Sequence, residues 1–194
     1  MPSDRDPTRV YEVDERIDRD HVPEFCPHCG SELTTVEREG RTRRACRPCD
    51  RVVYRNPDPG ACVVVRDGDA VLLVRRGVAP DAGGWVIPGG HLEVDEHPRV
   101  AAARELEEET SIAADPAALD LVDVGLVEFG GGKYTMPVVY GVDRAVTTGT
   151  VSRGTDADAA RFWSTEELRS HAAVPLERFA GAVETVLGES VTAD

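Results

Sequence analysis

The sequence predicts an α/β domain in which helices cover both sides of a mixed β-sheet, preceded by a small cysteine-rich module. Segments typical of strands occur before and after an unbroken helical segment at 98–110, and a second amphipathic segment follows at 175–187. This alternation favours a layered α/β/α sandwich. Two cysteine pairs stand upstream, before the proline-rich linker at 56–60. A chain of 194 residues suffices for one ordinary domain and a small appendage.

The chain is strongly acidic and almost free of lysine. Its net charge is −14, its isoelectric point is about 4.8, and Lys133 is the only lysine. Salt screens the self-repulsion of such a surface, so the composition favours a halophilic source. It also disfavours non-specific nucleic-acid binding by the whole surface. No apolar run reaches membrane-spanning length and residues 1–24 lack a signal-peptide core, so we expect a cytoplasmic protein without a membrane partner.

The first 55 residues divide into an arm and a metal-binding module. Residues 1–24 are polar and without clear periodicity, which predicts a mobile or loosely docked arm. Segment 25–55 contains two Cys-x2-Cys pairs with the spacing of a zinc ribbon. The predicted ligands of a structural Zn²⁺ are Cys26, Cys29, Cys46 and Cys49. Disulfides or free thiols are the alternatives, and a reducing cytoplasm disfavours disulfides. His28 is interpreted as a solvent-facing spacer, since four thiolates complete a zinc site.

Residues 38–55 form a local basic patch, with arginines outnumbering Glu39 and Asp50. The arginines are Arg38, Arg41, Arg43, Arg44, Arg47, Arg51 and Arg55. One interpretation is contact with the phosphates of a nucleic acid or a nucleotide. The other is pairing with acidic neighbours of the same chain, which we favour because charge runs are weak indicators of function.

The remaining segments supply the sheet. Strands are expected at 61–66 and 70–76 around an Asp-Gly turn, at 85–87, at 119–129 and 134–142 around a glycine-rich turn, and at 160–163. Cys62, in the first of these strands, is interpreted as an ordinary buried thiol. Residues 77–84 form a loop, and Ser164 to Glu167 have the pattern of a capping box that starts a short helix. Gly188 is expected to end the helix at 175–187.

The helical segment 98–110 carries a cluster of carboxylates. Pro98 suits the first helical position, and Ala102, Ala103 and Leu106 can pack on a sheet. Glu105, Glu108 and Glu109 share another face, while Glu107 is expected to point away. Like charges near a helix C-terminus destabilise it. A hard divalent cation would relieve that cost, because carboxylate oxygens are what Mg²⁺ prefers; a solvated charge run is the alternative.

The spacing around this helix resembles the box of the Nudix family. The matching pattern is Gly90, five residues, Glu96, seven residues, then Arg104-Glu105-Leu106-x-Glu108-Glu109-x-Ser111-Ile112. Ser111 replaces the last glycine of the pattern, and Asp95 stands where glycine is common. A left-handed helix cap is less favourable with serine, which could shift the end of the helix. The resemblance implies the Nudix α/β/α fold for residues 56–190.

The resemblance also implies site residues. The groups that would hold Mg²⁺ or Mn²⁺ are the carbonyl of Gly89 and the carboxylates of Glu105, Glu108 and Glu109. Arg104 and Glu96 would pair to orient helix and loop. The general base would be Glu105, or a later acid such as Asp156 or Asp158; these two acids are equally typical of an ordinary surface loop.

Four residues outside the box are candidates for contact with substrate or for the core. Arg76 and Tyr134 are candidates to contact the substrate, with a salt-bridging or core role as the alternative. Trp85 and Phe162 are interpreted as core residues.

The activity that the resemblance implies is cleavage of the diphosphate in a nucleoside diphosphate derivative such as ADP-ribose, FAD or NADH. The SQPWPFP-type motif of NADH pyrophosphatases is missing after the box, which weakens that substrate. A nucleotide sensor that binds nucleic acid through the arginine-rich ribbon is the alternative. Isopentenyl-diphosphate isomerase chemistry would need a reactive cysteine, and Cys62 lies in an apolar strand. Related enzymes are often homodimers.

Overall fold

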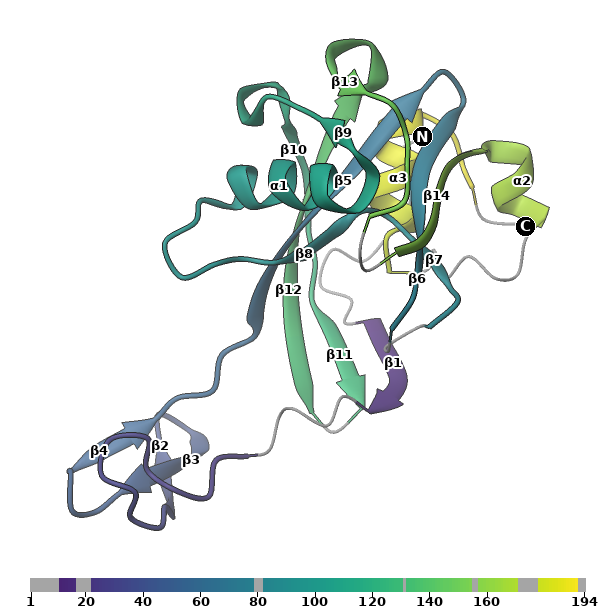
Figure 1. Ribbon diagram of the computed structural model, residues 1–194. Helices are drawn as coiled ribbons and strands as arrows, with labels where there is room; N and C mark the ends of the chain where they lie inside the picture. Colours follow the sequence, from purple (N-terminus) through teal and green to yellow (C-terminus); the bar gives the residue numbers. More distant parts are fainter. Residues whose placement is uncertain are drawn as a thin grey trace.

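The computed structural model (Figure 1) describes residues 11–16, 22–78, 82–130, 132–154, 157–170 and 178–191. The main sheet contains β1 (Tyr11–Arg16), β5 (Asp58–Asp67), β6 (Ala70–Arg76), β7 (Trp85–Val86), β8 (Gly89–His91), β10 (Asp120–Val124), β11 (Val127–Gly130), β12 (Lys133–Asp143) and β14 (Ala157–Ser164). The helices are α1 (Pro98–Thr110), α2 (Thr165–Ser170) and α3 (Ala180–Leu187), with short 3-10 turns η1 (Pro116–Ala118) and η2 (Arg144–Val146). β9 (Ile112–Ala113) pairs with β13 (Thr148–Gly149).

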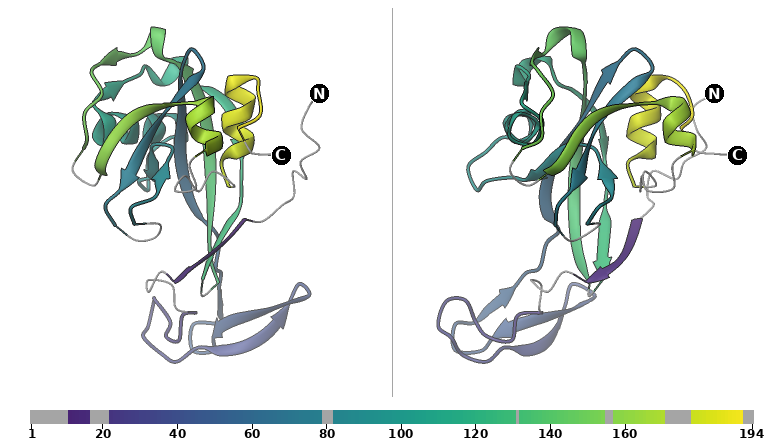
Figure 2. Two further views of the ribbon diagram at one scale, coloured as in Figure 1. Left: turned by 90° about the vertical axis from the view of Figure 1, so that its right-hand side faces the viewer. Right: turned by 45° about the vertical axis from the view of Figure 1, so that its right-hand side comes forward.

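The sheet is mixed, as predicted. Its order is β1-β11-β12-β5-β6-β14, with β10 beside β12, β7 beside β6 and β8 beside β5. The β5–β12 and β1–β11 pairs are parallel and the others are antiparallel. Helix α1 lies on one side of the sheet and α3 on the other (Figures 1 and 2). The predicted α/β/α sandwich is therefore confirmed.

The central strand β5 is buried on both faces. Val63 and Val65 pack with Leu106 of α1, whereas Val64 packs with Val183 of α3. Successive side chains of a strand point to opposite faces, so one apolar run serves both halves of the core. Burial of apolar side chains against both helices stabilises the sandwich by roughly 25 cal/mol for each Å² removed from water.

The sheet divides at one end, and this division positions the cavity described below. β5 and β6 pair only near their shared turn, through Arg66 with Val71 and Asp67 with Ala70. Beyond that point β5 pairs with β8, and β6 pairs with β7. The two halves of the sheet thus separate where the glycine-rich strand β8 meets α1.

The ribbon forms a separate small sheet of β2 (Thr34–Arg38), β3 (Arg41–Cys46) and β4 (Arg51–Val53). It projects from the end of the sandwich, beyond the β11–β12 hairpin (Figures 1 and 2). A hydrogen bond from the Arg55 guanidinium to the carbonyl of Gly132 joins the two parts.

Most elements agree with the sequence, and the differences have physical causes. Helix α1 has the predicted bounds, and Ser111 serves as a left-handed cap at φ 58° without shifting the helix end. The strand predicted at 119–129 is interrupted, because Pro137 of the facing strand has no N–H to donate; its carbonyl instead accepts from Gly125. The Ser164–Glu167 capping box forms as predicted, with reciprocal hydrogen bonds of 2.9 and 3.3 Å.

Two boundaries differ from the prediction, and the predicted arm contains a strand. The linker at 56–60 is shorter than predicted, because β5 already begins at Asp58 and pairs with β12. Helix α3 begins at Ala180 and ends at Gly188 in a left-handed cap; residues 175–177 lie outside the described ranges. Within the predicted arm, β1 pairs with β11. No helix in the described part of the chain is long and apolar enough to cross a membrane.

Candidate functional site

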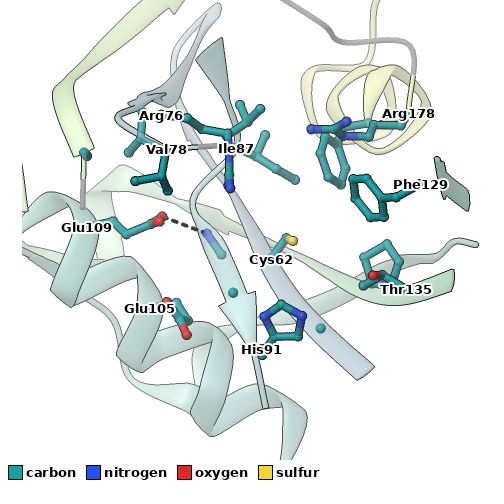
Figure 3. Close-up of a pocket in the computed structure, with 18 of the residues that line it drawn as sticks. Cys62, Arg76, Val78, Ile87, His91, Glu105, Glu109, Phe129, Thr135 and Arg178 are labelled. Atoms are coloured by element: carbon teal, nitrogen blue, oxygen red, sulfur yellow. Dashed lines mark hydrogen bonds between the residues drawn. The ribbon is translucent and has the colours of Figure 1, made fainter. Parts of the chain in front are cut away.

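A cavity of about 400 Å³ opens where the two halves of the sheet separate. Its walls come from β5, β6, β8 and β12, from the helix α1 and from the residues just before α3. Figure 3 shows Glu105 and Glu109 of α1 on one side, Arg178 and Phe129 on the other, and Cys62 between them. The cavity therefore has an acidic end formed by the box helix and a second end that is cationic and aromatic.

The acidic end depends on close contact between α1 and the glycines of β8. The backbone N–H of Gly89 donates to Oε2 of Glu109 at 2.9 Å (Figure 3). A Cβ at Gly90 would lie only 2.4–2.7 Å from the carboxylate atoms of Glu105, so only glycine leaves room for that carboxylate. Gly89 is equally restricted, since it has φ +155° and its Cβ would overlap the backbone of β5. The two glycines thus form a cradle for the carboxylates.

Arg104 neutralises much of this acidic end. Its guanidinium makes two hydrogen bonds to Glu96, each 2.9 Å long, and so forms the predicted ion pair. It also contacts Glu105 at 2.9 Å, Glu108 at 3.2 Å and the carbonyl of His91 at 3.2 Å. The hydrogen bonds from Arg104 lower the pKa of Glu96 below its ordinary value. One arginine of α1 therefore contacts the carboxylate of Glu96 in the preceding loop and two carboxylates of the helix itself.

The predicted carboxylate cluster is only partly assembled. Burial raises the pKa of Glu105, and the hydrogen bond from Arg104 opposes that rise. Glu108 turns toward Arg104 with 58% of its side chain exposed, and Glu107 is exposed as predicted. In the part of the chain that the structure describes, the carboxylate oxygens of Glu105, Glu108 and Glu109 do not converge to the spacing of a shared cation site.

The residues nevertheless fit a hard divalent cation. Glu105 and Glu109 present carboxylate oxygens to one end of a cavity lined by Gly89 and Gly90, and the glycine cradle leaves that approach open. Oxygen ligands of this kind suit Mg²⁺ or Mn²⁺. Glu108 lies within one helical turn of both and could join them by rotating away from Arg104.

The C-terminus of α1 is covered by a loop that the sequence did not reveal. The N–H of Gly154 donates to the carbonyl of Glu109, and the N–H of Ser152 donates to the carbonyl of Thr110, each at 2.9 Å. A Cβ at Gly154 would lie 2.0 Å from the carbonyl oxygen of Glu108. These donors satisfy helix carbonyls that would otherwise lack partners and hold the carboxylate-bearing turn in place.

Several residues at the far end of the cavity were missed by the sequence analysis. Lys133 is 8% exposed, and its ammonium lies 3.1 Å from the carboxylate of Asp58. The Arg178 guanidinium lies 5.3 Å from the ring centroid of Phe179 and 6.0 Å from that of Phe129. The sequence could have marked Lys133 as a candidate, because it is the single lysine of an arginine-rich chain and lies next to a glycine-rich turn. Arg178 is too far from the box in sequence to be found by spacing.

The other predicted site residues are divided between the cavity and the surface. Arg76 lines the cavity, whereas Tyr134 does not, because its neighbours Lys133 and Thr135 point into it and successive strand residues alternate. Asp158 pairs with Arg75 at 3.5 Å on the surface, away from the cavity lining. Asp156 lies outside the described residues.

The aromatic and cysteine predictions had mixed outcomes. Trp85 and Phe162 pack against the core, as expected. Cys62 also packs against the core, but it lines the cavity as well, which the sequence did not suggest. Burial raises the pKa of its thiol to about 12, which disfavours the thiolate that isomerase chemistry would need.

The four cysteines of the ribbon form a compact cluster. The sulfurs of Cys26, Cys29, Cys46 and Cys49 all lie within 4.8 Å of one another. Tetrahedral Zn²⁺ with Zn–S bonds of about 2.3 Å requires sulfurs about 3.8 Å apart, so the donors fit zinc. His28 is exposed and is not part of the cluster.

The arginines of the ribbon are not paired as we expected. Among the described residues, none of the seven forms an ion pair with a carboxylate. Among these residues nothing supports the interpretation that acidic neighbours neutralise the basic patch, and that interpretation stays a prediction. Arg44 and Arg55 instead donate to backbone carbonyls, those of Pro23 and Gly132.

Comparison with known sequences defines the class of protein. The family model of the NUDIX domain matches residues 56–182, more than half of the chain. The chain therefore belongs to the Nudix family, in agreement with its sandwich fold and its box helix. The matched region contains every residue of the acidic end of the cavity.

Two of three similar relatives are named as hydrolases of phosphorylated compounds. The chain is 36% identical over 107 residues to a MutT-like protein of Streptomyces ambofaciens, covering 55% of this chain and 62% of the relative. It is 35% identical over 111 residues to the human m7GpppN-mRNA hydrolase NUDT17, covering 55% of this chain and 30% of that protein. It is also 35% identical over 82 residues to diphosphoinositol polyphosphate phosphohydrolase 2 of Rattus norvegicus, covering 42% and 37%. The chain thus spans less than two thirds of the length of these relatives.

Solved structures support the fold. A NUDIX hydrolase from Nitrosomonas europaea superposes with a TM-score of 0.63 at 21% identity, covering 88% of this chain and 97% of that one. The NUDIX domain of Shewanella oneidensis NrtR, complexed with ADP ribose, gives a TM-score of 0.57 at 17% identity, covering 68% and 87%. Both likenesses concern the fold alone.

Proposed function

We propose that the protein is a metal-dependent pyrophosphohydrolase that cleaves the diphosphate of a nucleoside diphosphate derivative. One observation carries this proposal: the carboxylates of Glu105 and Glu109 face the same cavity end against a cradle that only glycine permits. The cradle would serve no purpose for a helix face that is merely solvated. Two relatives named for hydrolysing phosphorylated compounds agree with this reaction class.

The proposed roles follow from position. Glu105, Glu108, Glu109 and the Gly89 carbonyl would hold Mg²⁺ or Mn²⁺. Bound cations of this kind offset the charge of a diphosphate and lower the pKa of an attacking water. Arg104 would act as a positioning residue, because its bidentate contact with Glu96 fixes the loop while its remaining N–H groups orient Glu105 and Glu108.

As an alternative to holding metal, Glu105 is the candidate general base. Burial raises its pKa above the ordinary value, and a carboxylate with a raised pKa is a stronger base. The competing candidate Asp158 is held at the surface by Arg75, which argues for Glu105.

The far end of the cavity points to the remainder of the substrate. Lys133 and Arg178 place positive charge there, and Phe129 and Phe179 offer aromatic rings beside it. Such a surface suits an anionic group next to a planar ring, as in ADP-ribose, FAD or NADH. Arg76, on the β6 wall, is the candidate to contact a phosphate between the two ends.

Replacing Glu109 by Gln tests the metal assignment. The substitution removes one negative charge and almost no volume, so turnover should fall by at least about a hundredfold, as when a group that stabilises the transition state is lost. Glu107→Gln is the matched control, because Glu107 is exposed on the same helix turn and should retain full activity. Affinity for Mn²⁺, measured by calorimetric titration, should drop only in the first variant.

A panel of nucleoside diphosphate derivatives, assayed with Mg²⁺ and Mn²⁺, would identify the substrate. A nucleotide sensor would bind a member of the panel without hydrolysing it. Full activity of Glu109→Gln, or binding without turnover by the unmodified protein, would contradict the proposed function.

A further inference from the structure

The ribbon sheet has two different faces. In its register Arg43 lies opposite Val36, Arg41 opposite Arg38, and Ala45 opposite both Thr34 and Val52. Directly opposed residues share a face, so these side chains all lie on one side. The other side carries Cys46 and Val53 and packs on the cysteine cluster. The first side is turned away from the cysteine cluster, and we call it the arginine face.

A shallow hollow of about 500 Å³ lies over the arginine face. Its lining includes Thr34, Val36, Arg38, Val52 and Tyr54, and Arg47 and Arg51 border it. Tyr54 is 53% exposed, and the Arg43 guanidinium lies 5.0 Å from the centroid of its ring. Glu37 and Asp50 are the acidic residues in this lining, and Glu37 is engaged by the hydroxyl of Thr42 at 2.6 Å.

The arginines of this face differ from several of those in the Nudix domain. There Arg66, Arg75, Arg104, Arg161 and Arg169 each form an ion pair with a carboxylate, whereas Arg99 and Arg144 donate to backbone carbonyls or to a hydroxyl. On the arginine face, Arg38, Arg41 and Arg43 have no carboxylate partner within the described ranges. The Nε of Arg43 is buried and has no hydrogen-bond partner there. In a chain of net charge −14, unpaired arginines beside an exposed tyrosine indicate a surface kept for an external anion.

We propose that the arginine face binds single-stranded nucleic acid. Arginine guanidiniums suit phosphate oxygens, and an exposed tyrosine ring provides a platform on which an unpaired base can stack. A duplex keeps its bases stacked on one another, so it could use the arginines but not the ring. The acidic remainder of the protein repels a polyanion, which confines binding to this module. Single-stranded RNA and single-stranded DNA both offer the phosphate oxygens and unpaired bases that this surface would contact.

Fluorescence anisotropy with the full zinc-loaded chain tests this surface. The probes are labelled oligouridylate and oligothymidylate, titrated over a tenfold range of KCl concentration, with circular dichroism at each salt concentration to verify folding. Tyr54→Ala should weaken binding by at least about fivefold, as loss of one stacked base does, and Tyr54→Phe should restore it. Arg41→Gln with Arg43→Gln should reduce the slope of log affinity against log salt by about 1.4, since each phosphate contact on a single strand contributes about 0.7.

Arg169→Gln is the matched control, because it removes a positive charge from α2 of the Nudix domain and should leave nucleic-acid binding unchanged. Hydrolysis of a small nucleotide should be the same in all of these variants, so this test is independent of the proposed catalytic function. Tighter binding of oligouridylate than of oligothymidylate would identify RNA as the source, and the reverse would identify DNA. The proposal is overturned by absent binding in folded protein, by Tyr54→Ala binding as tightly as the unmodified chain, or by polyglutamate competing as well as either oligonucleotide.

Discussion

Replacing Gly90 by Ala should disable the acidic end of the cavity while leaving the sandwich folded. The new methyl group would lie 2.4 Å from Oε1 of Glu105, 2.5 Å from Cδ and 2.7 Å from Oε2. Gly90 is not among the glycines with positive φ, so alanine adds no backbone strain at this position. The clash is with the tip of a side chain, and the carboxylate of Glu105 must move away.

The expected loss of stability is small compared with the expected loss of activity. Forcing Glu105 from its rotamer costs about 0.5–1.5 kcal/mol, and losing its hydrogen bond with Arg104 costs about 1 kcal/mol. Alanine in place of glycine regains about 0.4–1 kcal/mol by restricting the unfolded chain. The net loss of about 0.5–2 kcal/mol corresponds to a few degrees in Tm for a domain of this size. Turnover should fall by about 10²–10⁴, as expected when a general base is displaced.

A double-mutant cycle isolates the cause. Turnover and thermal unfolding are measured for Gly90→Ala, Glu105→Ala and the double variant. Once the carboxylate is gone, the methyl group has nothing to displace, so the double variant should be as active as Glu105→Ala alone. Gly89→Ala is the contrasting case: its Cβ would overlap the carbonyl of Ala61 at 2.5 Å, and it should destabilise the fold itself. Unchanged turnover in Gly90→Ala, or additive losses in the double variant, would refute the importance of this contact.

Further predictions concern the ribbon, the loop before α1 and the core. Removing zinc with a chelator should unfold the ribbon, because its buried cluster contains little beyond Leu33 and the cysteines. Calorimetry should still show a separate unfolding transition for the Nudix domain. A thermal unfolding profile that the chelator leaves unchanged would contradict this prediction. Arg104→Lys keeps the charge but loses the bidentate contact with Glu96, so the affinity for Mn²⁺ should fall about 10–100-fold in a calorimetric titration. Affinity equal to that of the unmodified protein would contradict the positioning role of Arg104. The pKa of Glu96 is lowered in the folded protein, so the ionised carboxylate stabilises the fold fully above its unfolded pKa of 4.5, and this stabilisation is lost as pH falls through the folded pKa. Acid denaturation should therefore begin at higher pH in Glu96→Gln. Identical acid denaturation curves for the two proteins would argue against this ion pair. Leu106→Ala, at a fully buried position facing β5, should lower the free energy of unfolding by about 2–5 kcal/mol in urea titrations, whereas Val100→Ala, on an exposed part of the same helix, should have little effect.

The sequence predicted best where local chemistry decides the structure. Helix α1 begins at Pro98, because proline suits a first helical turn, and its carboxylates could be assigned to one face from their spacing alone. The continuous apolar run of β5 and the two cysteine pairs were equally clear in the sequence. These features depend on neighbours in the chain.

The sequence failed where segments far apart come together. The break between β10 and β11 depends on Pro137 of another strand, which cannot donate a hydrogen bond. Lys133 and Arg178 meet in one cavity although 44 other residues separate them in the chain. The support of the α1 C-terminus by Gly154 is likewise a contact between distant segments. No local pattern contains such information.

The single lysine offers a chemical handle that few proteins of this size possess. Apart from the α-amino group, the ε-amine of Lys133 is the sole primary amine on the chain, and it sits in the cavity wall beside Asp58. Reagents selective for amines would therefore modify one defined side chain at this site. The rate of that modification would report occupancy of the cavity in solution, without any label introduced by mutation.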